Sequence, residues 1–469
     1  YFDYDSKKSG GLTVSHLRFS DRQIRSTCLV NKADFVSCQN QTYLAKYDMI
    51  SDIKKGGTFL INCSHDDKWI NNSIPFKQRM HILKNDIKVY AIDGLEIGRR
   101  TGLNSKISTI LQCAFFKVTG IIPIEEAIKY MKEAAKASYG QKGEKIVRMN
   151  NDAIELAAEG VRKVTITENK QRELSEINDN KNDRNIRTFP DIKSNTSLDY
   201  YVNVIEKEVL RCKGNDLPVS AFMNFSNGAL PSGSTAYERR NVAVTVPEWI
   251  KENCIQCNRC SFVCPHSVIR PAVLNDEDVR RMPSGMEAGD MTGLPGHKFS
   301  IVISYADCTG CGSCAAVCPG MKGKKALTMV ATGNHEEKQE FFDFAKGLSE
   351  KECVYEKFAD NTVKGSQFRK PYMEFSGACA GCGETPYVKL LTQLFGRRMF
   401  IANATGCSSI WANSFPSTAY TIDENGYGPA WSSSLFEDGA EFGFGMYTGY
   451  EAVRRSLIEK ISQLYNECG

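Results

Sequence analysis

The most specific chemical signal in this chain is the spacing of the cysteines in two runs. They are Cys254-x-x-Cys257-x-x-Cys260-x-x-x-Cys264-Pro265 and Cys308-x-x-Cys311-x-x-Cys314-x-x-x-Cys318-Pro319. Thiolates at this spacing are typical ligands of 4Fe–4S clusters: three cysteines of a run bind one cluster, and the fourth, before the proline, binds the other. The spacing therefore predicts two clusters, one held by Cys254, Cys257, Cys260 and Cys318 and the other by Cys308, Cys311, Cys314 and Cys264.

Zinc sites and a disulfide framework are the alternatives for these cysteines. Zinc sites usually pair two Cys-x-x-Cys knuckles, whereas both runs here contain four cysteines and end in Cys-Pro. The chain has 18 cysteines in all. Clustered thiolates together with scattered thiols indicate a reducing compartment rather than a secreted disulfide protein. We expect the following scattered cysteines to be buried or free thiols: Cys28, Cys38, Cys63, Cys113, Cys212 and Cys353.

Three further cysteines, Cys379, Cys382 and Cys407, lie among small residues. Glycines let the backbone approach an inorganic cluster closely and direct N–H groups at its sulfurs. A lone Cys-x-x-Cys is more often a redox pair or half of a zinc site, so these residues alone leave the choice open. A fourth ligand is lacking unless Cys468 or a residue after Gly469 supplies it.

Composition sets wide limits on the class of protein. A length of 469 residues predicts three to four domains. A net charge of +4 is nearly neutral for this length, so it favours neither nucleic acid nor a membrane surface as a partner. No apolar run reaches 18 residues, and no signal-peptide pattern opens the chain. Because the first residue is Tyr1 rather than Met, we expect the sequence to be a segment of a longer protein.

Residues 1–165 alternate strand-like and helix-like segments. Residues 56–62 and 87–92 are predicted to form buried strands, and residues 107–118 and 124–138 to form helices. The pair Gly56-Gly57 lacks a P-loop pattern and is predicted to form a turn before a strand. This alternation is typical of an α/β domain with a largely parallel sheet.

The rest of the chain divides by composition. Residues 166–235 are predicted to be a linker and a small connecting region, because residues 169–197 are polar and charged with few large apolar residues. Residues 236–345 contain both cysteine runs, with an insertion between them at 275–298. Residues 346–469 form a third region. His266, which follows Cys264-Pro265, is predicted to pack or hydrogen-bond rather than to bind metal.

Several segments resemble the pyruvate:ferredoxin (flavodoxin) oxidoreductase family. FSGACAGCGETPYVKLLTQLFGRRMFIANATGCSSIW (375–411), GPAW (428–431) and SLFED (434–438) resemble the start of its thiamine-diphosphate domain. YDSKKSGG (4–11), SHLRF (15–19) and residues 140–150 resemble its gamma-type domain, and residues 255–267 resemble its ferredoxin-like domain. The resemblance follows the family's domain order over nearly the whole chain.

The resemblance implies an α/β multidomain fold. The implied domains are a gamma-type α/β domain (1–165), a linker and small connecting region (166–235), a ferredoxin-like α+β domain with two 4Fe–4S clusters (236–345), and the amino-terminal part of a thiamine-diphosphate α/β domain (346–469).

The resemblance also implies roles for individual residues. Cys379, Cys382 and Cys407 would bind a third, proximal 4Fe–4S cluster, whose fourth ligand would lie after Gly469. Glu384 and Cys407 would lie against thiamine diphosphate as catalytic residues. Lys8 and Asn150 match positions tied to coenzyme A, and Ser108 stands where the family has an asparagine. The pyruvate-binding residues would precede Tyr1, and the motif that holds Mg²⁺ and the diphosphate would follow Gly469, so we expect this chain alone to be inactive.

The function implied by the resemblance is oxidative decarboxylation of pyruvate with coenzyme A to acetyl-CoA and CO₂, with electrons passing through three 4Fe–4S clusters to ferredoxin. The alternatives are flavodoxin or NADP as acceptor, the latter through a fused flavin reductase, and a non-catalytic two-cluster electron carrier. A homodimer is implied for the intact enzyme, with no nucleic-acid or membrane partner. Its compartment is expected to be the cytoplasm, with a hydrogenosome-like organelle as the alternative.

Overall fold

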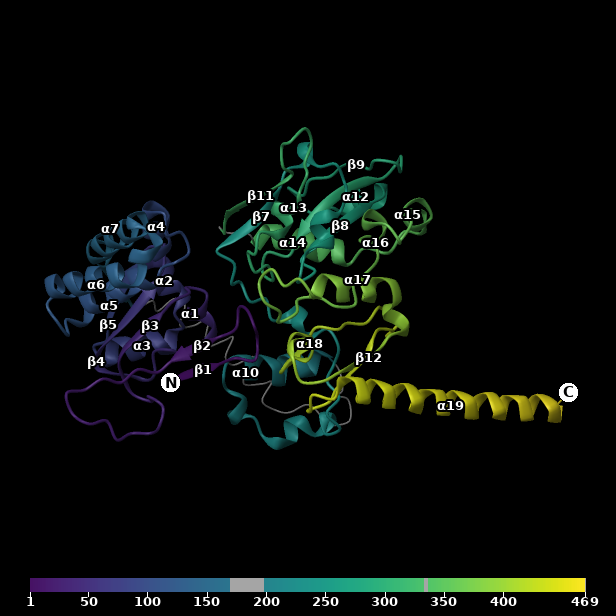
Figure 1. Ribbon diagram of the computed structural model, residues 1–469, viewed down its shortest axis with the longest axis horizontal. Coiled ribbons are helices and arrows are strands. Elements are labelled where there is room, and N and C mark those ends of the chain that lie inside the picture. The colour runs from purple at the N-terminus through teal and green to yellow at the C-terminus, as the bar shows by residue number, and fades with distance from the viewer. Residues whose placement is uncertain (169–197, 333–335, 469) are drawn as a thin grey trace. The chain divides into compact units, whose positions relative to one another are not determined.

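The computed structural model (Figure 1) describes residues 1–168, 198–332 and 336–468. It divides into two compact units: residues 1–3 with 15–193, and residues 4–14 with 194–469. The predicted polar linker at 169–197 lies outside the described residues. Among the described residues, no helix combines the length and the apolar character needed to cross a membrane.

The first unit is built on one four-stranded sheet of mixed direction. Its strands, in spatial order, are β3 (Ala33–Cys38), β4 (Ile53–Asn62), β5 (Lys88–Ile92) and β6 (Arg162–Lys163). β4 is parallel to both β3 and β5, and β6 adds antiparallel to the edge of β5. The predicted strands at 56–62 and 87–92 are confirmed as β4 and β5, and the sheet is largely parallel, as alternation of strands and helices predicts.

Helices cover both faces of this sheet (Figure 1). Successive residues of a strand point to opposite faces, so Phe59 and Ile61 of β4 enter one core and Leu60 enters the other. The first core is covered by α1 (Tyr43–Lys46), α2 (Asp67–Ser73) and α3 (Phe76–Lys84). The second is covered by α4 (Gly94–Thr101), α5 (Ser108–Thr119), α6 (Ile124–Tyr139) and α7 (Glu144–Gly160). α5 and α6 confirm the two predicted helices.

The prediction of a turn at Gly56-Gly57 is wrong. β4 begins at Ile53 and runs through both glycines. Its register against β3 shifts between Ala33 and Phe35, so residues 54–57 form a bulge inside the strand. Gly56 has φ +73°, a conformation that glycine adopts without a Cβ penalty. The two glycines therefore lie inside β4, where they interrupt its pairing with β3, and not in a turn before the strand.

The second unit contains several small sheets instead of one large one. The three-stranded antiparallel sheet has the order β8 (Ile269–Leu274), β10 (Lys298–Ile303), β9 (Gly289–Asp290), and β7 (Thr245–Trp249) pairs antiparallel with β11 (Leu327–Ala331). Short helices accompany them: α11 (Arg259–Phe262), α12 (Asp276–Arg281), α13 (Ser313–Val317), α14 (Glu336–Lys346), α15 (Glu352–Lys357) and α16 (Val363–Ser366). Their common core includes Val246, Phe299 and three of the cysteines, namely Cys264, Cys308 and Cys314.

The remainder of this unit continues from α17 (Thr385–Phe395). The later elements are β12 (Phe400–Asn403), α18 (Cys407–Ala412), β13 (Asn413–Ser414), β14 (Ser417–Thr418), β15 (Ala430–Ser433) and α19 (Gly439–Cys468). β12 and β15 pair in parallel, and α19 extends away from them (Figure 1). Residues 198–237 contribute α9 (Leu198–Tyr200), a π-helical turn η3 (Tyr201–Glu206) and α10 (Lys207–Leu210), followed by 3₁₀ turns. The short strands β1 (Phe2–Tyr4) and β2 (Thr13–Ser15) flank the segment 4–14.

The first unit offers a test of its close packing at Gly98. The loop after α4 folds back so that the Asn104 N–H donates to the Gly98 carbonyl at 2.8 Å, and a Cβ on Gly98 would lie 2.1 Å from the Asn104 oxygen. We expect Gly98→Ala to lower the free energy of unfolding by about 1–3 kcal/mol, because the backbone must move to relieve the overlap. The measurement is urea denaturation followed by circular dichroism. In the control Gly140→Ala, where no atom lies within 4 Å of the added Cβ, the stability should not fall; an equal fall in both variants would contradict the packing argument.

Candidate iron–sulfur sites

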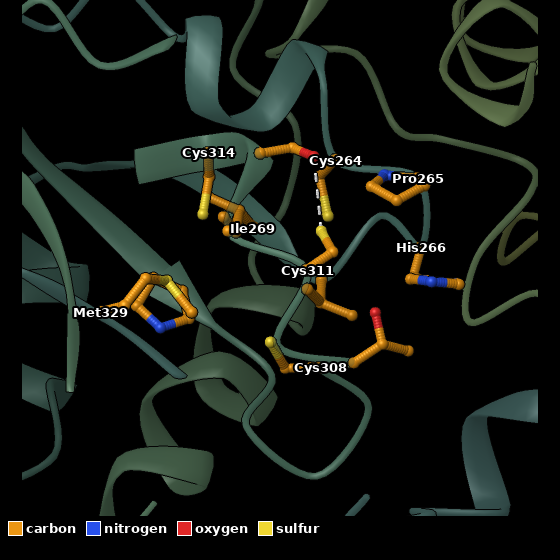
Figure 2. Close-up of a pocket in the computed structure, with 13 residues that line it drawn as sticks. Cys264, Pro265, His266, Ile269, Cys308, Cys311, Cys314 and Met329 are labelled. Carbon is orange, nitrogen blue, oxygen red and sulfur yellow. Dashed lines mark hydrogen bonds between the residues drawn. The ribbon is translucent and has the colours of Figure 1, made fainter. Parts of the chain in front are cut away.

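Four cysteines from both runs surround one cavity of the second unit. Figure 2 shows Cys264 with Cys311 just below it in this view, Cys314 to their left and Cys308 lower down, so that the four side chains surround one space. The cavity has about 320 Å³ of empty volume, part of it open to solvent. Cys264, Cys308 and Cys314 are buried, whereas Cys311 is exposed and its thiol lies 3.5 Å from the Ser313 hydroxyl.

A second cavity is lined by the other four cysteines of the two runs, which are Cys254, Cys257, Cys260 and Cys318. It has about 340 Å³ of empty volume, again partly open to solvent, and apolar side chains such as Trp249, Ile301 and Leu327 complete its wall. The structure thus brings together the same two groups of four that the spacing predicts, each combining three cysteines of one run with the last cysteine of the other. Their role as cluster ligands stays a prediction.

The two loops that carry the first three cysteines of each run, residues 254–260 and 308–314, have left-handed residues at equivalent positions. In the first loop Gln256 and Asn258 have φ of 56° and 58°, and in the second loop Gly310 and Gly312, at the equivalent positions, have φ of 69° and 77°. Left-handed residues at alternate positions curl a short segment around a point and turn its N–H groups inward, a geometry suited to an anionic group. This repeat in conformation explains why each loop presents three sulfurs to one cavity.

Backbone N–H groups point at several of these sulfurs. Gln256 donates to the Cys254 sulfur at 3.4 Å, and Gly310 donates to the Cys308 sulfur at the same distance from the equivalent position of the second loop. Ala326 donates to the Cys318 sulfur at 3.3 Å. Such bonds favour sulfur atoms that carry negative charge, as cysteine ligands of iron do.

The electrostatics of the cavities disfavours free thiolates. Burial, together with the neighbouring sulfur of Cys264, raises the pKa of both Cys308 and Cys314 to about 12. Burial likewise raises the pKa of Cys260 and Cys254. Sulfurs gathered in this way ionise only beside a compensating cation, and a bound metal deprotonates a coordinating thiol outright. The donor set therefore fits an iron–sulfur cluster in each cavity. In the described residues, no group of three or more His, Cys, Asp or Glu side chains is arranged to hold a single metal ion.

The third cysteine group lies at the starts of α17 and α18, and a hydrogen bond joins these two regions. Cys379 and Cys382 form a turn directly before α17, and Cys407 is the first residue of α18. The Trp411 indole N–H, on α18, donates at 3.2 Å to the carboxylate of Glu384, which precedes α17. Cys379 and Cys407 are exposed and Cys382 is partly buried. The structure thus links Glu384 to the helix that Cys407 begins.

The third group also borders the first cavity described above. A Cβ on Gly381, between Cys379 and Cys382, would lie 3.7 Å from the Cβ of Cys311. Gly381 has φ +77°, so glycine suits both the conformation and the close approach. The turn with Cys379 and Cys382 is therefore next to the cavity of Cys264, Cys308, Cys311 and Cys314.

The residues predicted to contact coenzyme A are distributed over both units. In the first unit, Asn150 is buried on α7, where its amide donates to the Ile146 carbonyl at 2.9 Å and accepts from the Thr109 hydroxyl at 3.2 Å. Ser108, next to Thr109, is exposed at the start of α5. In the second unit, Lys8 is exposed and its N–H donates to the Gly377 carbonyl at 2.9 Å, two residues before Cys379. Asn150 and Thr109 thus meet, and Lys8 lies beside the third cysteine group.

His266 packs in the way that the sequence predicts. It is buried, and its Nδ1 lies 3.1 Å from the Ser376 carbonyl. Burial, together with the charge of Arg240, lowers the pKa of His266 to about 3, so the ring is neutral.

Several buried charges near these sites have no signal in the sequence pattern. Lys7 pairs with Glu238 at 2.9 Å with almost no exposure of either side chain, and Arg240 donates to the carbonyls of Ser9 and Ser376. Lys389 of α17 is likewise buried. Charged residues are rarely buried, and no periodicity distinguishes these few from the many exposed ones.

Comparisons with known proteins agree with this geometry. The family model described as pyruvate ferredoxin/flavodoxin oxidoreductase matches residues 1–160, a domain of unknown function matches 190–243, and a 4Fe-4S dicluster domain matches 253–323. A mixed α/β fold with a 4Fe–4S domain is thereby confirmed, whereas the finer subdivision stays a prediction.

Similar proteins match almost the whole chain. A pyruvate-flavodoxin oxidoreductase of Enterobacter agglomerans is 44% identical over 98% of this chain and 38% of its own length. A pyruvate:ferredoxin oxidoreductase of Moorella thermoacetica is 45% identical over 99% of this chain and 38% of its own length. A pyruvate dehydrogenase [NADP(+)] of Cryptosporidium parvum is 41% identical over 98% of this chain and 24% of its own length. The chain thus spans about two fifths or less of the length of these curated relatives.

One solved structure, the pyruvate oxidoreductase subunit PORC of Thermotoga maritima, is 17% identical over 29% of this chain and 67% of its own, with a TM-score of 0.24. That likeness supports no argument about the fold.

The close packing of the second cysteine loop, residues 308–314, against the Thr245 carbonyl can be tested at Gly310. A Cβ on Gly310 would lie 2.7 Å from the Thr245 carbonyl oxygen, whereas the Cβ of Gly312 would meet no atom within 4 Å, although both residues have positive φ. We expect Gly310→Ala to lower the iron content of the purified protein by about half, because the loop must move away from its cavity. The matched variant Gly312→Ala has the conformational strain without the overlap, so it should retain most of its iron. Equal iron in both variants and the wild type would contradict this account of the loop.

Proposed function

This chain belongs to the pyruvate:ferredoxin (flavodoxin) oxidoreductase family, and from that premise we propose that it carries electrons away from a coenzyme A-dependent oxidative decarboxylation of pyruvate. The single observation that carries the proposal is the pair of four-cysteine cavities, each built from both runs. The N–H groups directed at the sulfurs and the match to a 4Fe-4S dicluster domain support the same assignment.

In this proposal the cysteine groups form a path with a direction. Cys379, Cys382 and Cys407 hold a cluster nearest to thiamine diphosphate, because they flank Glu384 and the α18 helix. Cys264, Cys308, Cys311 and Cys314 hold the next one, because Gly381 lies against Cys311. Cys254, Cys257, Cys260 and Cys318 hold the outermost one. When bound, each 4Fe–4S cluster supplies one-electron transfer at a potential set by its surroundings.

The chain's own residues have positioning roles in this proposal. Glu384 and Cys407 lie against thiamine diphosphate. Lys8, Asn150 and the segment around Ser108 contribute to binding coenzyme A. The domains are those named from the sequence: gamma-type (1–165), connecting (166–235), ferredoxin-like (236–345) and thiamine-diphosphate (346–469).

The relatives differ in the acceptor that their names state, which is flavodoxin, ferredoxin or NADP(+). We propose ferredoxin or flavodoxin as the acceptor, since both are one-electron carriers that suit a path of 4Fe–4S clusters. We further propose that the intact enzyme is a homodimer of the cytoplasm, or of a hydrogenosome-like organelle.

Pairwise substitution tests the exchange of the fourth cysteine between the two sites. If Cys264 belongs with Cys308, then Cys264→Ala and Cys308→Ala each remove about four of about eight irons held by the two runs, and the double variant removes no more than either alone. If Cys264 belonged with Cys254 instead, the double variant would lose both clusters. The measurement is iron and acid-labile sulfide per chain after anaerobic purification. Cys353→Ala, a cysteine outside both cavities, serves as the control with full iron.

Substitution of Glu384 tests the link to catalysis. In the enzyme that contains this chain, we expect Glu384→Ala to slow pyruvate-dependent dye reduction in the presence of coenzyme A by at least about tenfold, or about 1.4 kcal/mol of transition-state stabilisation. The exposed Glu424 provides the control, Glu424→Ala, which should retain the rate. Dithionite reduction of the clusters should be normal in both variants. An unchanged rate in Glu384→Ala would argue for a non-catalytic electron carrier.

A further inference from the structure

A buried lysine lies at the loop that joins the two cavities. Lys389, in the middle of α17, retains 2% of its exposure and belongs to the largest fully buried side chains of the described residues. Its ammonium group donates to the carbonyl oxygens of Ser261 and, at 3.1 Å, of Phe262. No ion pair between Lys389 and a carboxylate is present in the part of the chain that the structure describes. Lys389 is thus a buried cation held by two peptide carbonyls.

The position of these carbonyls places the charge between the two cavities. Ser261 and Phe262 end the short helix α11, with Cys260 of one cavity before them and Cys264 of the other cavity after them. Burial lowers the pKa of Lys389 to about 8, while the charges of Cys264 and Cys260 act to raise it. The ammonium form is therefore retained at neutral pH.

Other cations nearby share a carboxylate. Arg270 and Lys346 both bind Glu374, and although burial favours its neutral form, these two cations hold the pKa of Glu374 at about 2. Arg270 lies close enough to Lys389 to disfavour its ammonium form. Lys389 contributes a charge that no carboxylate offsets.

Capping α11 does not by itself require a charge. A neutral amide donor could satisfy the same carbonyls without the desolvation that an ammonium group suffers on burial. What an ammonium group adds is an electrostatic field, and in an interior of low dielectric constant this field reaches both cavities with little screening. Reduction adds one electron to a cluster, so a fixed cation nearby favours the reduced form.

We propose that Lys389 is a positioning residue whose buried charge raises the reduction potentials of the clusters on both sides of α11. The inference rests on the proposed function, because it requires clusters in the two cavities. It assigns to α17, the helix that follows Cys379 and Cys382, an electrostatic role at the next two steps of the electron path. No bond forms or breaks in this role; only the equilibrium of one-electron reduction changes.

The test compares Lys389→Met with the wild type in anaerobically purified protein. We expect at least a tenfold loss in the equilibrium constant for reduction of each of the two clusters, which is about 59 mV for a one-electron couple. The measurement is a redox titration followed by electron paramagnetic resonance, with iron content determined on the same samples. Lys357→Met, the same substitution at an exposed lysine that ends α15, should leave both potentials unchanged.

Two further variants separate charge from structure. Lys389→Gln keeps a donor for the α11 carbonyls without the charge, so its potentials should fall as in Lys389→Met, whereas Lys389→Arg keeps the charge and should restore them. Unchanged potentials in an iron-replete Lys389→Met or Lys389→Gln protein would overturn the proposal. Loss of iron from both neutral variants would also overturn it, since Lys389 would then only hold the loop. Wild-type protein without iron would instead refute the proposed function.

Discussion

The second unit depends on the burial of cysteine sulfurs around two cavities. Cys264, Cys308 and Cys314 belong to the same core as Val246 and Phe299, in a region whose sheets have only short strands. Sulfurs that are buried and close together resist ionisation, as the raised pKa of Cys308 and Cys314 shows. A cluster in each cavity would supply the compensating iron and would tie together segments far apart in sequence. Folding and metal binding are then one equilibrium, as in other small metal-bound folds.

Contacts around α11 show how the later part of the chain supports this arrangement. The Ser261 hydroxyl donates to Gln367, which in turn donates to Gln393 of α17, and Lys389 of the same helix holds the α11 carbonyls. The Phe375 N–H donates to the His266 carbonyl at 2.9 Å. The change in composition near residue 346 therefore does not mark a gap in packing. The same segment continues into Cys379 and Cys382. These contacts therefore help to fix the position of the two cysteines relative to the other two cysteine groups.

Local patterns predicted what depends on local chemistry. Cysteine spacing grouped the eight thiols, and apolar periodicity placed α5 and α6, because a ligand loop and a helix face are each defined within a few residues. The bulge at Gly56-Gly57 depends on how β4 pairs with β3, so the glycines alone suggested a turn. Lys389 is the clearest omission: in the sequence it is a polar residue on an amphipathic helix, and only packing against α11 buries it. The contacts with thiamine diphosphate and coenzyme A were predicted from the family resemblance alone, because the spacing of residues within this chain does not indicate which cofactor they contact.

The two cysteine loops, residues 254–260 and 308–314, place left-handed residues at equivalent positions by different means. Left-handed residues are costly for any side chain, and the second loop avoids this cost with Gly310 and Gly312, the former packed against the Thr245 carbonyl. The first loop instead places Gln256 and Asn258 there, and both side chains bind neighbouring segments: Gln256 donates to the Asp290 carbonyl at 2.7 Å, and Asn258 to the Lys364 carbonyl at 2.9 Å. Those bonds offset the backbone strain and fix the first loop to the segment between the runs and to α16. The symmetry of the cysteine spacing thus conceals an asymmetry, since one loop is positioned by its backbone and the other by its side chains.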